Sequence, residues 1–323
     1  MTYLYITSEC NNDCEYCCSK SLRGKNQFLS FDEIELFLDW LDSDIEEKHI
    51  FITGGEPTLH PDLKKILRRC SFFTNTTLMT NLLCSKELIE ELLEINYITW
   101  NISTNPKKEL EKTFLDNLSY LLSEKDLIKK NKITIGLSLT LYENQENNTK
   151  NIGKILGLLE KYKEIITYVE PRLAMPIPDG DEYKIINYTE EISYLVSNIN
   201  ERFPNIFINF GECAITNCQI APALYGKLLE NPMVTNLNFG CHYNTSSIAI
   251  LPDKSHLPCP HFDLKFKTNE YKNFPKGNIA KYWNLNRMEK YKSSEKFTCN
   301  CNNLICKEAG FCTAIRANLL NRK

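Results

Sequence analysis

The chain has 323 residues, of which 42% are hydrophobic and 24% charged, and its formal net charge is −3. These values are typical of a globular protein and exclude disorder, collagen and a coiled coil, and the charge gives no support to a nucleic-acid-binding protein. The N-terminus lacks the features of a signal peptide, and no apolar run reaches the ~18 residues that a membrane helix needs. We therefore expect a cytoplasmic protein whose partners are neither nucleic acid nor a membrane.

Two strand–helix units are predicted at the start of the chain. The alternating segment Tyr3–Thr7 predicts a short strand. The capping box Ser30–Glu33 begins a helix whose apolar residues would share one face, namely Ile34, Leu36, Phe37, Trp40 and Leu41. His49–Thr53 predicts the second strand, and Pro61 marks the first turn of the helix after it.

Four further strand–helix units follow, up to about residue 201. The strands are expected at Thr76–Thr80, Tyr97–Ser103, Lys132–Leu141 and Ile165–Met175. The helices behind them are expected from the cap Ser85 to Glu94, from about Lys107 to Leu122, from the cap Thr149, and over Thr189–Glu201. Six such units imply a parallel sheet, because each parallel connection needs a crossover. The sheet is either doubly wound or curled into a full or partial barrel, and in both cases ligand sites lie at the carboxyl ends of the strands.

Cysteine is the unusual residue, with 14 in the chain. In a chain without an export signal, dense cysteine points to a metal or to catalysis more than to disulfides. Three of these thiols follow the first strand in the pattern Cys10-x3-Cys14-x2-Cys17. Three thiolates on one loop can bind three irons of a cubane cluster and leave the fourth iron open. The alternative is a zinc site completed by Cys18 or by a distant residue, because structural zinc takes four ligands.

Two motifs together resemble the radical S-adenosylmethionine (radical SAM) enzyme family. The first is the cysteine motif, in which the aromatic Tyr16 precedes the last cysteine, and the second is the segment Thr53–Leu59, similar to the family's glycine-rich SAM-binding stretch. The resemblance covers about residues 1–205 and implies an α/β fold, a partial (β/α)6 TIM-type barrel. It implies a [4Fe–4S] cluster with SAM on its open iron, an external electron donor such as flavodoxin or ferredoxin, and a 5′-deoxyadenosyl radical that removes a substrate hydrogen. The cluster ligands would be Cys10, Cys14 and Cys17.

The resemblance also assigns residues of the glycine-rich stretch to SAM. Gly54 and Gly55 would let the backbone approach the cofactor closely, because a Cβ would block it. The backbone at Gly55 and Glu56, just before Pro57, would meet the methionine amino group. Tyr16 would lie near the adenine.

Three further SAM contacts are expected at other strand ends. Asn81 lies where relatives carry Thr-Asn-Gly, although Leu82 replaces the glycine and predicts a different turn. Ser103 and Arg172 are candidates for the ribose and the carboxylate of SAM. The alternative for these two is an ordinary strand-end hydroxyl and a surface arginine.

The last third of the chain carries eight cysteines and few helical patterns, so we expect the barrel over residues 1–208 and a small domain over 209–323. The segments around Cys241 and Cys259 resemble a SPASM or "twitch" domain, which implies one or two auxiliary [4Fe–4S] clusters. By this resemblance an inner cluster would use Cys241, Cys259, Cys312 and an upstream cysteine, and an outer one Cys299, Cys301 and Cys306. Cys213 and Cys218 would complete the eight. A single cluster, or zinc bound by four cysteines, remains the alternative.

The function implied is that of a radical SAM oxidoreductase that oxidatively modifies a ribosomally synthesised precursor peptide, for example by a crosslink or thioether. No further domain precedes the barrel in the sequence, so leader-peptide recognition is expected to need a separate protein or another surface. The alternative is a dehydrogenase or epimerase that acts on a small molecule such as an aminosugar. A zinc scaffold without catalysis would leave Gly54–Leu59 unexplained. Cys70 and Cys84 are expected to be buried small hydrophobic residues and not hydrogen donors.

Overall fold

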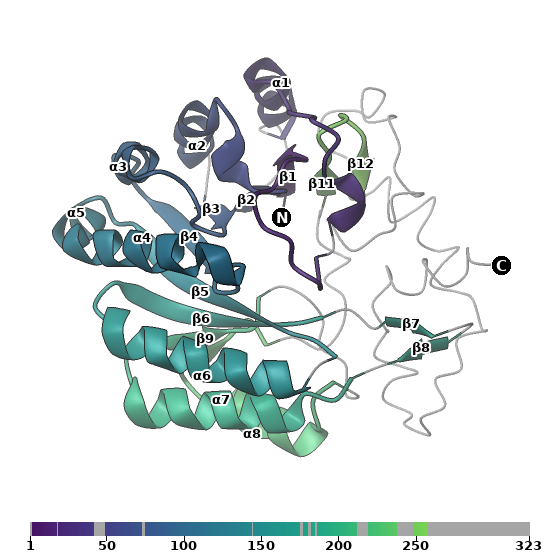
Figure 1. Cartoon of the computed structure of the whole chain (residues 1–323), viewed down its shortest axis with the longest axis vertical. Helices are drawn as coiled ribbons and strands as arrows, with labels where there is room; N and C mark the ends of the chain where they lie inside the picture. The colour runs from purple at the N-terminus through teal and green to yellow at the C-terminus, as the bar shows by residue number, and fades with distance from the viewer. Residues whose placement is uncertain are drawn as a thin grey trace.

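A curved parallel sheet forms the centre of the computed structural model, and helices cover its outer face (Figure 1). The structure describes residues 2–17, 19–41, 49–72, 75–143, 145–174, 177–179, 182–184, 186–211, 219–237 and 248–257. Six strands pair in parallel in the order in which they follow in the chain. This order identifies a curled partial barrel, because a doubly wound sheet reverses its strand order. The strands are β1 (Thr2–Thr7), β2 (His49–Gly54), β3 (Asn75–Thr80), β4 (Ile98–Ser103), β5 (Thr134–Leu141) and β6 (Ile166–Leu173).

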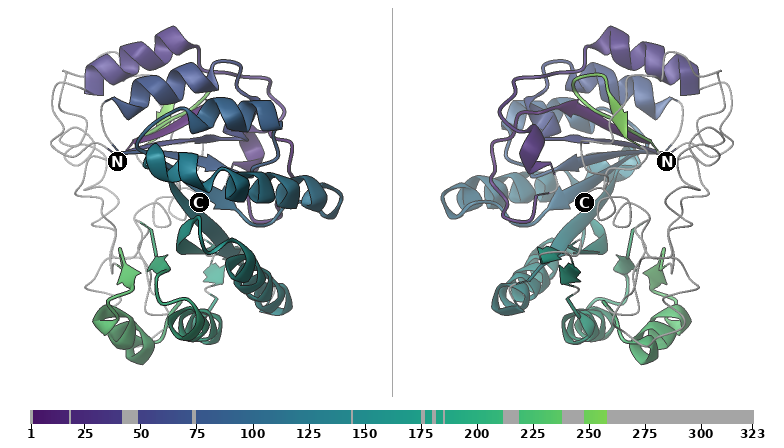
Figure 2. Two further views of the ribbon diagram at one scale, coloured as in Figure 1. Left: turned by 90° about the vertical axis from the view of Figure 1, so that its left-hand side faces the viewer. Right: turned by 90° about the vertical axis from the view of Figure 1, so that its right-hand side faces the viewer.

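A helix follows each of the six strands or lies in the connection to the next one. Figure 2 shows the two ends of the resulting arc, with α1 at one end and α7 and α8 at the other. The helices are α1 (Phe31–Leu41), α2 (Leu63–Ser71), α3 (Lys86–Leu93), α4 (Glu111–Ser123), α5 (Lys125–Lys130), α6 (Gln145–Tyr162), α7 (Thr189–Arg202) and α8 (Pro222–Glu230). Short 3-10 helices are η1 (Lys20–Leu22), η2 (Pro57–Leu59) and η3 (Lys108–Leu110). Within the described residues, no helix is both long and apolar enough to cross a membrane.

The sheet continues beyond the six-stranded barrel on both sides. β9 (Phe207–Asn209) pairs with β6, and β10 (Val234–Thr235) pairs with β9. At the other edge β11 (Ile248–Ile250) runs parallel to β1, and β12 (His256–Leu257) pairs antiparallel with β11. A separate hairpin consists of β7 (Ile177–Asp179) and β8 (Glu182–Lys184). The domain boundary at 208/209 stays a prediction.

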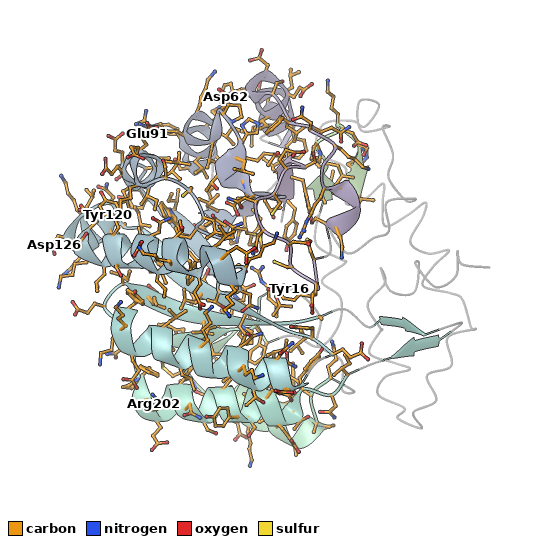
Figure 3. The ribbon with its side chains drawn as sticks, viewed as in Figure 1. Tyr16, Asp62, Glu91, Tyr120, Asp126 and Arg202 are labelled. Carbon is orange, nitrogen blue, oxygen red and sulfur yellow. The ribbon has the colours of Figure 1, made fainter. Side chains whose placement is uncertain are left out.

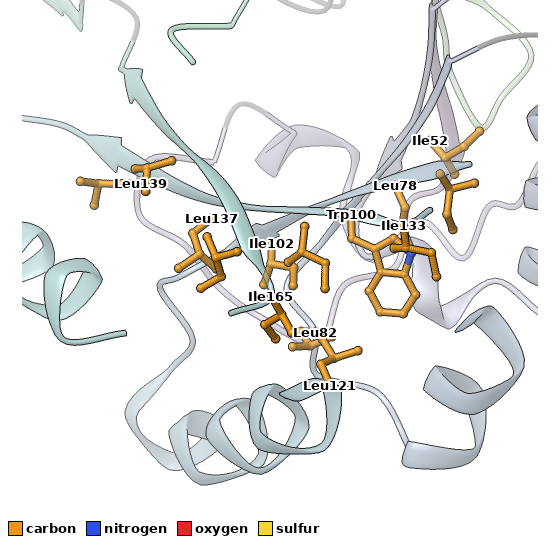
Figure 4. Packing of buried hydrophobic residues seen from close by; sticks show 14 of the residues in the cluster. Ile52, Leu78, Leu82, Trp100, Ile102, Leu121, Ile133, Leu137, Leu139 and Ile165 are labelled. Atoms are coloured by element: carbon orange, nitrogen blue, oxygen red, sulfur yellow. The ribbon is translucent and has the colours of Figure 1, made fainter. Parts of the chain in front are cut away.

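The two faces of the sheet differ in chemistry. Side chains of one parity are mostly apolar and are buried against the helices, as Figure 4 shows for Trp100, Ile102 and Leu137 packed near Leu121 of α4. Because successive side chains in a strand point to opposite faces, their neighbours lie on the inner face of the curve. These inner-face residues are largely polar and include Thr77, Asn101, Ser138 and Glu170. The sequence therefore builds an apolar outer layer and leaves polar groups for the barrel interior.

Most predicted elements are confirmed, and the local differences have simple causes. The capping box forms, with Ser30 N donating to Glu33 at 2.9 Å and Glu33 N donating to Ser30 at 3.3 Å. Leu36 was expected on the buried face but is 72% exposed, and Leu38 takes the buried place. The helix after Pro61 begins two residues later, at Leu63.

The start of α6 is a further correction. The helix begins at Gln145, so Thr149 lies inside it and is not its cap. The side chain of Asn148 instead closes the preceding turn, accepting from Tyr142 N at 3.0 Å and donating to Tyr142 O at 2.8 Å. α5 and the β7–β8 hairpin were not predicted.

Candidate functional site

The loops after β1, β3 and β4 are joined by asparagine side chains at the carboxyl edge of the sheet. Asn11 in the cysteine loop donates to Leu83 O and accepts from Asn81 Nδ2, both at 2.8 Å. Asn12 donates to Asn105 O at 3.1 Å. The cysteine loop is thus fastened to two neighbouring strand ends. Sequence reasoning missed Asn11 and Asn12, although two amides inside a metal-binding loop are a usable signal.

The three candidate cluster ligands lie on this fastened loop and are half-buried. Asn12 donates to Cys10 Sγ from its backbone at 3.5 Å and to Cys14 Sγ from its side chain at 3.4 Å. Burial raises the pKa of the Cys10 and Cys14 thiols. A bound metal would deprotonate them, because a coordinated thiol binds as thiolate. Together with Cys17, they form a donor set that fits a three-thiolate cluster.

No three His, Cys, Asp or Glu side chains in the described part of the chain lie close enough together to hold one metal ion. That geometric test concerns a single ion. In a cubane cluster each thiolate binds a different iron, so the ligands need not converge on one point.

Arg23 places a positive charge beside the thiols. Its Nη1 lies 2.6 Å from Asp13 Oδ1, and 16% of its side chain is exposed. Its charge opposes the effect of burial and lowers the pKa of both Cys10 and Cys14. Sequence reasoning missed Arg23, which lies outside both motifs.

The glycine pair at the end of β2 packs directly on the cysteine loop. Gly55 N donates to Thr7 O at 2.8 Å, and Glu56 N donates to Glu9 O at 2.7 Å. A Cβ on Gly54 would lie 2.4 Å from Thr7 O, and a Cβ on Gly55 would lie 2.0 Å from Glu9 O. Glycine is therefore needed at both positions because of the protein's own backbone, whereas the expected reason was close approach to SAM. These two N–H groups are bonded to the protein's own backbone, and Glu56 O accepts from Leu59 N at 3.1 Å. The contact of this segment with SAM stays a prediction.

The buried carboxylate of Glu56 joins the loops after β2 and β3. Its Oε1 accepts from Thr58 N at 3.1 Å, from Thr58 Oγ1 at 2.8 Å and from Thr80 Oγ1 at 2.6 Å, and its Oε2 accepts from Asn81 N at 2.8 Å. Burial raises its pKa, and these bonds act in the opposite direction. Pro57 follows at the start of η2 and is buried. The sequence indicated a backbone role for Glu56, whereas the side chain also organises the site.

We predict that Glu56→Gln lowers the free energy of unfolding by about 2 kcal/mol, the cost of one buried unpaired donor. The backbone N–H groups of Thr58 and Asn81 point at different oxygens of the carboxylate. Either orientation of a glutamine amide would therefore turn its NH2 group toward one of them. Urea unfolding measures the change. The exposed Glu94→Gln is the control, and equal stability of the two variants would contradict the prediction.

The turn after Asn81 differs from the expectation. Leu82 adopts a φ of 59°, the left-handed backbone that favours glycine, so this turn is one that a glycine would also make. Asn81 Oδ1 accepts from Leu83 N at 2.9 Å, and the Asn81 side chain is buried. The prediction of a different turn was wrong. The contact of Asn81 with SAM stays a prediction.

Tyr16 and Ser103 are brought together at the end of β4. The Tyr16 hydroxyl accepts from Asn105 Nδ2 at 2.9 Å and lies near both Ser103 and Cys14. The ring lies 5.2 Å from that of Tyr142, centroid to centroid. Figure 3 shows Tyr16 on the side of the barrel away from α5. Burial raises its pKa, so the hydroxyl stays protonated, and Asn105 and Tyr142 are neighbours that sequence reasoning missed.

Arg172 is part of an ion pair and not an isolated surface residue. Its Nε lies 2.6 Å from Glu170 Oε1, and 33% of its side chain is exposed against 12% for Glu170. The second carboxylate oxygen, Oε2, accepts from Asn101 Nδ2 at 2.5 Å. Glu170 and Asn101 were missed because inner-face polarity is visible only once the strands are in register.

The remaining cysteines divide into two groups. Cys70 is fully buried in α2, as expected, and Cys84 is half-buried; burial raises the pKa of each to about 12. Cys18 and the eight late cysteines lie outside the described residues, so their roles stay predictions. The eight are Cys213, Cys218, Cys241, Cys259, Cys299, Cys301, Cys306 and Cys312.

Residues 4–112 match the model of the Radical SAM superfamily. This segment of the chain is a radical SAM domain. Radical SAM enzymes use a [4Fe–4S] cluster and SAM, and the matched segment contains the cysteine loop and the Gly54–Glu56 segment described above. The expected family is thereby confirmed.

The proteins similar to this chain include GTP 3′,8-cyclases. A probable GTP 3′,8-cyclase of Pyrococcus abyssi is 25% identical over 211 residues, covering 64% of this chain and 66% of that one. The GTP 3′,8-cyclase of Campylobacter lari is 30% identical over 167 residues, covering 48% and 49%. The Pyrococcus furiosus tungsten-containing aldehyde ferredoxin oxidoreductase cofactor-modifying protein is 25% identical, covering 89% and 82%. The chain spans at most about two thirds of the length of these two cyclases.

Solved structures share the fold over most of the chain. SuiB of Streptococcus suis bound to its precursor peptide SuiA has a TM-score of 0.60 at 17% identity, covering 97% of this chain and 70% of that one. The enzyme anSMEcpe with AdoMet and the Kp18Cys peptide has a TM-score of 0.56 at 18% identity, covering 87% and 82%. At these identities the likeness shows the fold, and it confirms the radical SAM partial barrel.

Proposed function

We propose that this radical SAM enzyme oxidatively modifies a ribosomally synthesised peptide. The observation that carries the proposal is the fold likeness to two peptide-bound enzymes, which extends over 87–97% of the chain and so beyond the 4–112 segment common to the superfamily. A polar inner face beside the cysteine loop supports it, because a substrate must reach the loop from the barrel interior.

In this proposal the chain's own residues divide the work at the carboxyl edge of the barrel. Cys10, Cys14 and Cys17 would hold the cluster, and the carbonyl groups of Gly55 and Glu56 would accept from the amino group of SAM. When bound, the cluster and SAM supply a 5′-deoxyadenosyl radical that abstracts a substrate hydrogen. The site residues position and shield that chemistry. Tyr16, Asn81, Ser103 and Arg172 would surround the rest of SAM.

The late cysteines would bind one or two auxiliary clusters that accept an electron from the substrate and make the net reaction an oxidation. An external donor such as flavodoxin or ferredoxin would reduce the first cluster. Iron and sulfide analysis tests the auxiliary sites, because each [4Fe–4S] cluster adds about four irons per chain. Zinc without sulfide would contradict the assignment.

A second candidate is a reaction on a small molecule. The sequence similarity to GTP 3′,8-cyclases favours it, because two of these relatives match at 25–30% identity. The small-molecule alternative includes a dehydrogenase or epimerase acting on an aminosugar.

The deciding experiment is anaerobic reconstitution with iron, sulfide, reductant and SAM, followed by measurement of 5′-deoxyadenosine. The protein is assayed alone, with a mixed pool of synthetic dodecapeptides, and with GTP. We expect the peptide pool to raise 5′-deoxyadenosine release above the rate without substrate, and GTP to have no effect. Stimulation by GTP alone would overturn the peptide proposal in favour of the small-molecule one.

A further inference from the structure

On the inner face of the barrel, one buried hydrogen-bond acceptor has no partner among the residues that the structure describes. Asn101, on β4, is 3% exposed, and its Oδ1 is buried and forms no hydrogen bond within this described part of the chain. Its neighbours Trp100 and Ile102 point to the opposite, helix-covered face, so the amide belongs to the barrel interior. Buried polar atoms are normally paired, so this oxygen needs an explanation.

The orientation of this amide is fixed by Glu170. Asn101 Nδ2 donates to Glu170 Oε2 at 2.5 Å, and an ionised carboxylate can only accept. The NH2 end of the amide must therefore face Glu170, and the oxygen must face away from it. Arg172 holds the carboxylate in place from its other oxygen, at 2.6 Å. The amide cannot turn to remove the mismatch without losing the bond to Glu170.

The strand between them leaves room for this contact. β5 lies between β4 and β6, and it presents Gly136 opposite Asn101. A Cβ at Gly136 would lie 2.1 Å from the ring of Tyr168, so only glycine fits under that ring. The hydrogen-bonded residues Asn101, Glu170 and Arg172 therefore reach from β4 to β6 across β5, which carries no side chain at Gly136.

The geometry points to Asn101 as a substrate-positioning residue that accepts a hydrogen bond from a backbone amide N–H of the substrate peptide. A neutral donor is the matching chemistry, because the nearby negative charge is already compensated by the Glu170–Arg172 ion pair. An ammonium group would gain little from a carboxylate paired in this way. The inference rests on the proposed peptide substrate, in which every residue except proline supplies such an N–H group.

The test compares wild type, Asn101→Ala and Ser138→Ala with the dodecapeptide pool, each relative to its own 5′-deoxyadenosine release without peptide. Ser138 lies on the same inner face and is 4% exposed, and its hydroxyl is already bonded to Ile102 O, so it is a matched control. We expect Asn101→Ala to raise the pool concentration for half-maximal stimulation roughly tenfold, the weight of one hydrogen bond, and Ser138→Ala to leave it unchanged. A pool with every backbone amide N-methylated should act equally on wild type and Asn101→Ala.

Each other outcome has a definite meaning. If peptides stimulate wild type and Asn101→Ala at the same concentrations, the inference fails and the proposed function stands. If peptides stimulate neither the wild type nor Asn101→Ala, the proposed function is wrong, and so is the inference that rests on it. If Asn101→Ala still weakens the response to the N-methylated pool, the donor is a side chain and not the backbone. An Asn101→Ala protein that has lost cluster iron would show a scaffold role and would also overturn the inference.

Discussion

Cys14→Ala is expected to reduce 5′-deoxyadenosine formation at least about a hundredfold, since even the outer partners of a metal ligand change affinity or activity by 10–100-fold. Cys14 is one of three thiols on a loop that Asn11 and Asn12 fasten to neighbouring strand ends. Its sulfur accepts from Asn12 Nδ2 at 3.4 Å, and its removal leaves two of the three candidate cluster ligands. The measurement is 5′-deoxyadenosine release from SAM after anaerobic reconstitution, with iron content as an independent readout.

Cys84→Ala is the matched control for this prediction. Cys84 is a half-buried thiol of the loop between β3 and α3, and burial raises its pKa to about 12. The Cys84→Ala variant should bind as much iron as the wild type and cleave SAM as fast. If Cys14→Ala and the wild type cleave SAM equally, the assignment of the cysteine loop to the cluster is wrong.

The barrel could be predicted because its information is local. The strand expected at Tyr3–Thr7 and the helix caps at Ser30 and Ser85 were predicted from neighbouring residues, and all three form in the structure. The prediction of the buried face of α1 was wrong at Leu36. Leu36 and Leu38 lie two positions apart on this helix, and only packing decides which of the two is buried.

The site was predicted only as far as its motifs extend. The cysteine loop and Gly54–Glu56 are each a short continuous segment that follows a strand. Because β1 and β2 are parallel neighbours, the two segments were expected to meet at the carboxyl edge of the sheet. The hydrogen bond from Asn81 N to the Glu56 carboxylate joins residues 25 positions apart, and the bond from Asn101 to Glu170 joins residues 69 positions apart. Such contacts depend on strand register, which composition and spacing do not contain.

Gly55→Ala is expected to lower the free energy of unfolding by about 3 kcal/mol, at the upper end of the cost of overpacking. The added Cβ would lie 2.0 Å from Glu9 O and 3.0 Å from Ser8 O, both backbone atoms that cannot rotate away. To relieve this overlap, β2 must move from the cysteine loop, which breaks the bonds from Gly55 N to Thr7 O and from Glu56 N to Glu9 O. The displacement should also reduce the iron bound after reconstitution, because the loop that carries the three thiols loses its support.

Gly153→Ala separates this effect from the general consequence of replacing a glycine. Gly153 lies in α6, and a Cβ there would meet nothing within 4 Å. Alanine in a helix is favoured over glycine by about 1 kcal/mol, so this variant should be more stable than the wild type and bind the same amount of iron. Urea unfolding followed by circular dichroism, with iron analysis in parallel, compares the two variants. Equal stability and iron content in Gly55→Ala and Gly153→Ala would show that β2 does not support the cysteine loop through this contact.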